Sequence, residues 1–142
     1  MARALKEARR CLSWGDVPIG AVVTRGEEVL AAFGNECERR ADPTAHAEVL
    51  ALREAASALG SWRLDRCTIH VTLEPCAMCA GAMVLARLDR LVFGADDPKA
   101  GFAGSLGNLA QDPRLNHRLE VENGTLAEEA AALLREFFSK RR

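Results

Sequence analysis

The fold is decided by residues 67 to 95, CTIHVTLEPCAMCAGAMVLARLDRLVFGA. The first part of this stretch, Cys67 to Leu73, is rich in β-branched residues and predicts a strand. Glu74-Pro75 then marks a turn into an apolar segment, about Cys76 to Ala86, which predicts a helix, and Leu91 to Ala95 predicts a second strand. A strand, a helix and a strand in so short a span form a βαβ unit, in which the two strands run parallel.

The segments on both sides extend this unit into one layered domain. Ile19 to Thr24 and Glu28 to Gly34 are β-rich runs, and the three residues between them predict an antiparallel hairpin. Helical periodicity predicts three further helices, at Ala2 to Ser13, about Ala45 to Leu59, and Leu126 to Ser139. Asp42 or Thr44 is the expected cap of the second of these. We therefore expect a single domain over residues 1–142 of the α/β class, with a mixed, roughly five-stranded central sheet in a three-layer α/β/α arrangement.

The composition narrows the class of protein. Apolar residues make up 49% of the chain and charged residues 27%, an ordinary globular balance, and no segment approaches the length of a membrane span. The first residues, Met1 to Lys6, lack the apolar core of a signal peptide, so we expect a cytoplasmic protein with no membrane partner. The net charge of −1 argues against a broadly basic surface, although Lys140 to Arg142 form a local basic cluster.

The cysteines indicate metal binding. Their number, five, is odd, and without a secretion signal a disulfide framework is improbable. Cys76 and Cys79 lie three residues apart in the first turn of a predicted helix, where the positive helix end favours thiolates. His46 opens another predicted helix. Two thiolates and one imidazole are a zinc ligand set, and three protein ligands leave the fourth position for water, as in catalytic sites.

Glu48 follows His46 by only two residues, so on a regular helix the two side chains point about 200° apart and do not both bind one ion. The sequence therefore predicts Glu48 beside the metal, as the group that moves protons in a hydrolytic reaction. Two alternatives are a structural zinc site and a thioredoxin-like dithiol. The redox alternative leaves His46 and Glu48 without a role.

The segments His46-Ala47-Glu48 and Pro75 to Cys79 resemble the signature of the zinc-dependent cytidine deaminase superfamily. Along nearly its whole length the chain is also similar to the bacterial tRNA-specific adenosine deaminases. The segments that carry this similarity are Val17 to Val22, Asn35, Asp42 to Glu48, Leu73 to Met83, Phe93 to Ala95, Asp97 to Ser105 and Asn116 to Arg118. The last two resemble the tRNA enzymes in particular rather than cytosine or guanine deaminases.

The resemblance implies a reaction and its partners. It implies conversion of adenosine to inosine at the wobble position of a tRNA anticodon, typically that of an arginine tRNA. The enzyme would be a homodimer with one Zn²⁺ per subunit, held by His46, Cys76 and Cys79. A water activated by the zinc would attack C6 of the flipped-out adenine, and Glu48 would move protons to the base and the departing amine.

Further roles are carried over by motif position. The resemblance assigns Asn35 to the target base or its ribose, the backbone N–H of Ala47 to the purine edge, Val17 and Pro18 to the apolar pocket, and Asp97 to the flanking nucleotides. Arg118 and the basic C-terminal helix would meet phosphates or stabilise the fold. Each has an ordinary alternative, since Asn35 and Asp97 are also common turn residues. Two competing functions stay open, a deaminase of free nucleobases and a catalytically silent zinc module that binds RNA.

Overall fold

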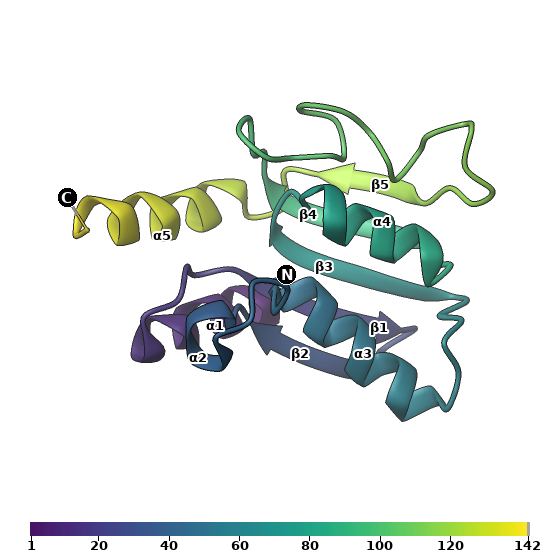
Figure 1. The fold of residues 1–142 in the computed structure, drawn as a ribbon, viewed down its shortest axis with the longest axis horizontal. Coiled ribbons are helices and arrows are strands. Elements are labelled where there is room, and N and C mark those ends of the chain that lie inside the picture. Colours follow the sequence, from purple (N-terminus) through teal and green to yellow (C-terminus); the bar gives the residue numbers. More distant parts are fainter. Residues whose placement is uncertain (142) are drawn as a thin grey trace.

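Five strands join in one mixed sheet in the computed structural model, which describes residues 1–141 (Figure 1). The strands are β1 (Gly20–Arg25), β2 (Glu28–Gly34), β3 (Cys67–Leu73), β4 (Arg90–Ala95) and β5 (Glu120–Asn123). Their spatial order is β2-β1-β3-β4-β5. β1 runs antiparallel to both β2 and β3, whereas β3, β4 and β5 are parallel. The predicted hairpin and the predicted βαβ unit are both confirmed.

Helices cover both faces of the sheet (Figure 1). The helices are α1 (Ala2–Arg10), the 3-10 helix η1 (Cys11–Trp14), α2 (Cys37–Arg40), α3 (Ala47–Leu59), α4 (Ala77–Leu85) and α5 (Ala127–Ser139). α3 and α4 contact each other over one face, and α1 contacts α5 on the other. A large buried cluster joins the sheet to α3 and α4, and a smaller one includes Leu5 of α1, Ala95 of β4 and Ala130 of α5. The predicted α/β/α class is therefore confirmed.

The structure differs from the sequence predictions in three local details. α1 ends at Arg10 and passes into the 3-10 turn η1, rather than continuing to Ser13. Neither Asp42 nor Thr44 caps α3: the N-cap is His46, because the carboxylate of Asp42 is used by the backbone N–H and hydroxyl of Thr44 in a local turn. α2 and β5 were not predicted, because α2 is a single turn and β5 exposes most of its four residues.

None of the helices described for residues 1–141 is both long and apolar enough to cross a membrane. Arg142, which the sequence analysis included in the basic C-terminal cluster, lies outside the described residues.

A substitution at Gly20 tests how α1 packs against the sheet. A Cβ atom at this position would overlap the backbone carbonyl oxygen of Ala4 in α1. We expect Gly20→Ala to lower the free energy of unfolding by about 3 kcal/mol, because the helix must move away from β1. Chemical denaturation measures this. The matched control is Gly81→Ala in the interior of α4, where nothing lies within 4 Å and alanine should raise stability by about 1 kcal/mol. Equal effects of the two substitutions would contradict this packing.

Candidate metal centre and substrate pocket

Two helix starts bring the predicted metal ligands together. His46 is the N-cap of α3 and Cys76 is the N-cap of α4, and both have extended backbone angles that end the preceding loop. Cys79 lies in the first turn of α4, one turn after Cys76. Because α3 and α4 lie side by side on one face of the sheet, the three side chains point into the same space.

The spacing of the three ligand atoms fits a tetrahedral ion. Nδ1 of His46 lies 3.7 Å from Sγ of Cys76 and 3.5 Å from Sγ of Cys79, and all three atoms lie within 4.8 Å of one another. Zinc bonds of about 2.3 Å to sulfur and about 2.0 Å to nitrogen, at tetrahedral angles, would separate N and S by about 3.5 Å. The donor set and its dimensions therefore fit Zn²⁺.

Burial and mutual hydrogen bonding shift the pKa values of the three candidate ligand groups. The hydrogen bond with Cys79 lowers the pKa of Cys76 to about 4, with a smaller contribution from His46. The same hydrogen bond, together with burial, raises the pKa of Cys79, and the hydrogen bond with Cys76 raises the pKa of His46. A cation that binds here replaces the thiol protons, which is the usual exchange at thiolate sites.

Glu48 lies beside this cluster and outside the group of three ligand atoms. The residue is only 4% exposed, and burial raises the pKa of its carboxyl group. After the hydrogen bond with Cys76 and burial, the charge of Glu48 also raises the pKa of the Cys79 thiol, so the two groups lie close together. A buried carboxyl next to a metal site is well placed to hold a proton and pass it on.

A cavity of about 320 Å³ opens next to His46. Its lining residues are Gly15, Asp16, Val17, Ile19, Asn35, Cys37, Glu38, His46, Phe137 and Arg141. Of the predicted substrate-binding residues, Val17 and Asn35 line it directly. Pro18 is fully buried and does not line it, so this residue packs beneath the wall of the cavity.

Ala47 and Asp97 lie near the cluster without lining this cavity. Ala47 is the first residue of α3, where the helix supplies no acceptor for its N–H, so that N–H is free to meet a ligand. Asp97 follows β4. It lies at the same end of the parallel strands as the turn Pro75-Cys76, which follows β3. Its carboxylate accepts hydrogen bonds from the backbone N–H groups of Lys99 and Ala100, so in the free protein it forms a turn.

Arg118 lies at the opposite edge of the sheet from the ligands. It precedes β5, which pairs in parallel with the beginning of β4, and it lines a polar pocket with Arg66 and Arg90. Its guanidinium donates to the carbonyl of Pro113. Of the two roles considered for Arg118, its place in the subunit therefore favours stabilising the fold.

Several residues that line this cavity were not predicted from the sequence as pocket residues, and Asp16, Phe137 and Arg141 are the most informative of them. Asp16 is buried, and its carboxylate accepts hydrogen bonds from the backbone N–H groups of Glu38 and Arg39 and from Nδ2 of Asn35 at 3.4 Å. It therefore orients the Asn35 amide. Phe137 and Arg141 come from the other end of the chain. An acidic residue before Val17-Pro18 was a visible signal for Asp16. The basic C-terminal helix was expected to meet phosphates or stabilise the fold, but nothing local placed Phe137 and Arg141 at this cavity.

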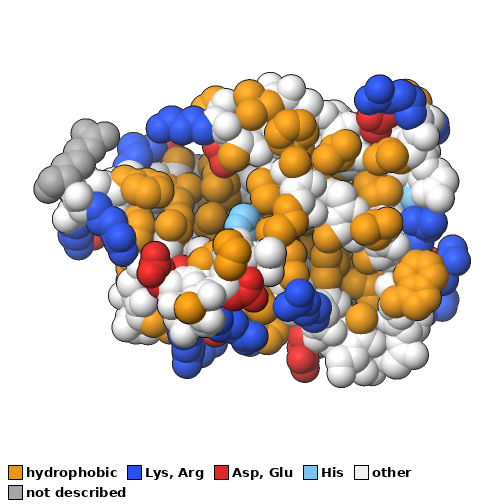
Figure 2. Space-filling model, viewed as in Figure 1, with side chains coloured by type: hydrophobic (Ala, Val, Ile, Leu, Met, Phe, Trp, Pro, Cys, Tyr) orange, Lys and Arg blue, Asp and Glu red, His pale blue; other side chains and the backbone are white. Residues whose placement is uncertain are grey.

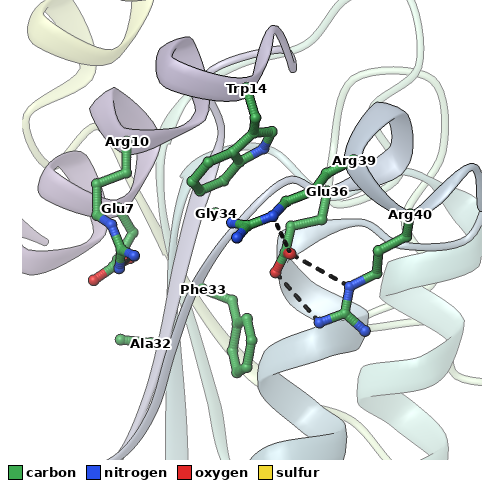
Figure 3. Close-up of a pocket in the computed structure, with 9 residues that line it drawn as sticks. All are labelled: Glu7, Arg10, Trp14, Ala32, Phe33, Gly34, Glu36, Arg39 and Arg40. Carbon is green, nitrogen blue, oxygen red and sulfur yellow. Dashed lines mark hydrogen bonds and ion pairs between the residues drawn. The ribbon is translucent and has the colours of Figure 1, made fainter.

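The side chains that line a second pocket hold the segment that carries Asn35 in place (Figure 3). Trp14 donates its indole N–H to the carbonyl of Asn35, and the guanidinium of Arg39 lies 4.5 Å from the centre of the Trp14 ring. Glu36 points between Arg39 and Arg40 and forms ion pairs with both. These contacts fix the backbone from Gly34 to Arg40, and hence one wall of the cavity next to His46.

Comparisons with known proteins show the family of the chain. A family model described as MafB19-like deaminase matches residues 1–142. The chain is 49% identical over 142 residues to the tRNA-specific adenosine deaminase of Bacillus subtilis, covering 100% of this chain and 88% of the relative. It is 45% identical to the enzyme of the same name from Aquifex aeolicus, covering 98% of this chain and 91% of the relative.

Two solved structures allow the chain to be compared with deaminases that act on different substrates. A structure from a study of A-to-I editing by tRNA:A34 deaminases has a TM-score of 0.91 at 42% identity, covering 94% of this chain and 97% of that one. A guanine deaminase from Nitrosomonas europaea has a TM-score of 0.83 at 26% identity, covering 97% of this chain and 82% of that one. The fold is thus shared with both, and the sequence is much nearer to the first.

The sheet, the three ligand atoms and the adjacent buried glutamate define a deaminase with the cytidine deaminase-like fold. The chain belongs to the deaminase family of the matching model and, within it, to the tRNA-specific adenosine deaminases.

Proposed function

We propose that this deaminase converts adenosine to inosine at the wobble position of a tRNA anticodon, using one Zn²⁺ held by His46, Cys76 and Cys79. The observation that carries the proposal is the trio of ligand atoms beside the buried Glu48. The names of the relatives at 42–49% identity support adenosine in tRNA as the substrate. As the sequence resemblance implied, the tRNA is proposed to be an arginine tRNA and the enzyme to act in the cytoplasm.

The chemistry is divided among the residues of the site. Zinc, when bound, would supply a Lewis acid that lowers the pKa of a water molecule to about 7. Glu48 takes a proton from the attacking water and passes it to N1 of adenine, and it then moves the second proton, from the hydroxyl now on C6, to the departing amine, so that one water is consumed and one ammonia leaves. The N–H of Ala47 and the amide of Asn35 hold the nucleoside, while Val17 gives the pocket an apolar lining and the buried Pro18 supports the backbone next to it.

The size of the cavity supports a single extruded nucleoside as the ligand. At about 320 Å³ it is at the small end of ligand pockets, and its lining combines Val17 and Ile19 with the polar groups of Asn35 and Asp16. A base within a stacked helix cannot reach such a site, so the reacting nucleotide must leave the stack. An anticodon loop offers a base that is already unpaired. Asp97, at the same sheet edge, is proposed to meet the nucleotides that flank it.

An assay of substrates tests the proposal. Purified zinc-loaded protein is incubated with an anticodon stem-loop that carries adenosine at the wobble position, and separately with free adenosine, guanine and cytidine. Product chromatography should find inosine in the stem-loop and no comparable turnover of the free compounds. Turnover of guanine or cytidine without inosine in the stem-loop would favour the free-base alternative. Stem-loop binding without any product would favour the silent RNA-binding module.

We also propose that the active form is a homodimer, with a second copy of the chain on the groove between α3 and α4. That groove is apolar, with Arg53 as its one charged residue, and at its rim Trp62 is 62% exposed and Leu85 70% exposed. Figure 2 shows hydrophobic side chains spread over this face. Exposed apolar patches of this kind mark protein interfaces. Sedimentation should give a dimer that Leu85→Glu converts to monomer; a wild-type monomer would contradict the proposal.

Arg141 offers a test of how the RNA backbone is held. Its guanidinium donates to the carbonyl of Gly15 at 2.7 Å and lies at the cavity beside Phe137. We expect Arg141→Ala to weaken stem-loop binding and to reduce the slope of log K against log salt by about 1, because one phosphate contact is lost. Fluorescence anisotropy at several salt concentrations measures this. Arg135→Ala is the control, since Arg135 pairs with Glu128 on the same helix away from the cavity. An unchanged slope would contradict the contact.

A further inference from the structure

Glu74 is a buried carboxylate that the proposed mechanism does not use. It follows the last residue of β3 and precedes the ligand turn Pro75-Cys76. The residue is 2% exposed, so its charge is removed from water. A buried carboxylate costs free energy unless its oxygens are fully hydrogen-bonded, and its partners therefore show what it holds in place.

All four hydrogen bonds to the Glu74 carboxylate come from one loop, residues 97–105. Oε1 accepts from the backbone N–H of Asp97 at 3.0 Å and from the hydroxyl of Ser105. Oε2 accepts from the N–H groups of Ala103 and Ser105, each at 3.0 Å. Burial alone would raise the pKa of Glu74, but these hydrogen bonds outweigh it and keep the pKa below its ordinary value. The carboxylate is thus the common acceptor at the centre of the loop.

The same loop is fastened to the metal-binding turn. The N–H of Phe102 donates to the carbonyl of Pro75 at 2.8 Å, and Gly101 forms a bridge with Cys76. A Cβ atom at Gly101 would overlap the Glu74 carboxylate, so the backbone of the loop lies directly against this group. The position of the loop is therefore set by Glu74 on one side and by the ligand turn on the other.

The loop also carries Asp97. The Asp97 N–H is held by Glu74, while the Asp97 carboxylate folds back on the N–H groups of Lys99 and Ala100. Any shift of the loop away from Glu74 therefore moves Asp97 relative to Cys76. The Glu74 carboxylate therefore links the turn that carries the metal ligand Cys76 to the loop that carries Asp97, the residue proposed to meet the flanking nucleotides.

We propose that Glu74 is a positioning residue that couples the substrate loop, residues 97–105, to the metal-binding turn at Pro75-Cys76. The proposal rests on the proposed function, because it takes Asp97 to face the nucleotides that flank the target. Glu74→Gln keeps the size of the side chain but turns an NH₂ group toward backbone N–H donors. At least one hydrogen bond is lost, and the new NH₂ group faces a backbone N–H, which is also a donor. The loop therefore moves.

Kinetics with the stem-loop test the coupling. We expect zinc-loaded Glu74→Gln to keep its metal and to show a KM raised by about tenfold, with a smaller change in kcat, because a buried acceptor is lost. If Glu74 acts through Asp97, the double variant with Asp97→Ala should be no worse than Asp97→Ala alone. Multiplied effects in the double variant, or an unchanged KM, would overturn the proposal. A merely structural weakening would give multiplied effects.

A second measurement needs no activity. In zinc-loaded protein without RNA, hydrogen exchange of the segment 97–105 should be faster by about tenfold or more in both Glu74→Gln and Ser105→Ala. The control is Glu7→Gln, which removes another buried carboxylate. Glu7 pairs with Arg3 and Arg10 in the same helix and is distant in sequence from residues 97–105. Exchange of residues 97–105 that stays at the wild-type rate in both loop variants would overturn the proposal. If wild-type protein does not edit the stem-loop, the proposed function fails, and exchange still decides the coupling.

Discussion

Glu48→Ala is expected to lower kcat for the stem-loop by about 10²- to 10⁴-fold, the usual contribution of a positioned acid or base, while the protein keeps one zinc per chain. The reason is geometric. Glu48 lies outside the group formed by the three ligand atoms, and its charge contributes to the raised pKa of the neighbouring Cys79 thiol. Removing it takes away the proton carrier and leaves the metal ligands in place. Single-turnover kinetics and elemental analysis measure the two quantities separately.

The stability of Glu48→Ala adds a second readout. Because burial raises the pKa of Glu48, the folded protein holds a costly carboxyl group at this position. Its removal should leave the thermal midpoint of the zinc-loaded protein unchanged or higher, as is common when a catalytic group is deleted. Glu54→Ala is the control, since Glu54 is an exposed glutamate on the same helix and should keep full activity. Loss of zinc from Glu48→Ala would show that Glu48 is a ligand.

The metal centre could be predicted because its information is local. Cys76 and Cys79 are one helical turn apart, and the spacing of His46 and Glu48 indicates that these two do not bind the same ion. That His46 joins the two cysteines was predicted from the ligand types and from the resemblance. The parallel βαβ unit is local in the same sense. Patterns of this kind depend on backbone periodicity, which a sequence displays directly.

The supporting residues could not be predicted because their partners are distant in sequence. Glu74 is recognised only through a loop more than twenty residues later, and Asp16 only through the backbone of Glu38 and Arg39. Phe137 and Arg141 reach the cavity from the far end of the chain. β5 is polar and short, and it exists because β4 offers an edge to pair with. Such features follow from tertiary packing, which composition and periodicity do not contain.

Cys79→Ser is expected to abolish zinc binding and to leave no measurable deamination. Serine keeps the shape of the side chain but offers a neutral hydroxyl instead of a thiolate, and only His46 and Cys76 would remain as ligands. The fold should survive, because the core between the sheet and α3 and α4 has many other members. Elemental analysis and the stem-loop assay test both statements.

Thermal denaturation with a chelator makes this test sharper. Zinc that binds only the folded state stabilises it, so a chelator should lower the midpoint of the wild-type protein. The same chelator should leave the midpoint of Cys79→Ser unchanged, because that variant has no zinc to lose. Cys67→Ser is the matched control: Cys67 is equally buried but lies at the start of β3, away from the ligands, so this variant should respond to the chelator like the wild type. A Cys79→Ser protein that still carries one zinc per chain would remove Cys79 from the ligand set and would contradict the proposed site of three protein ligands.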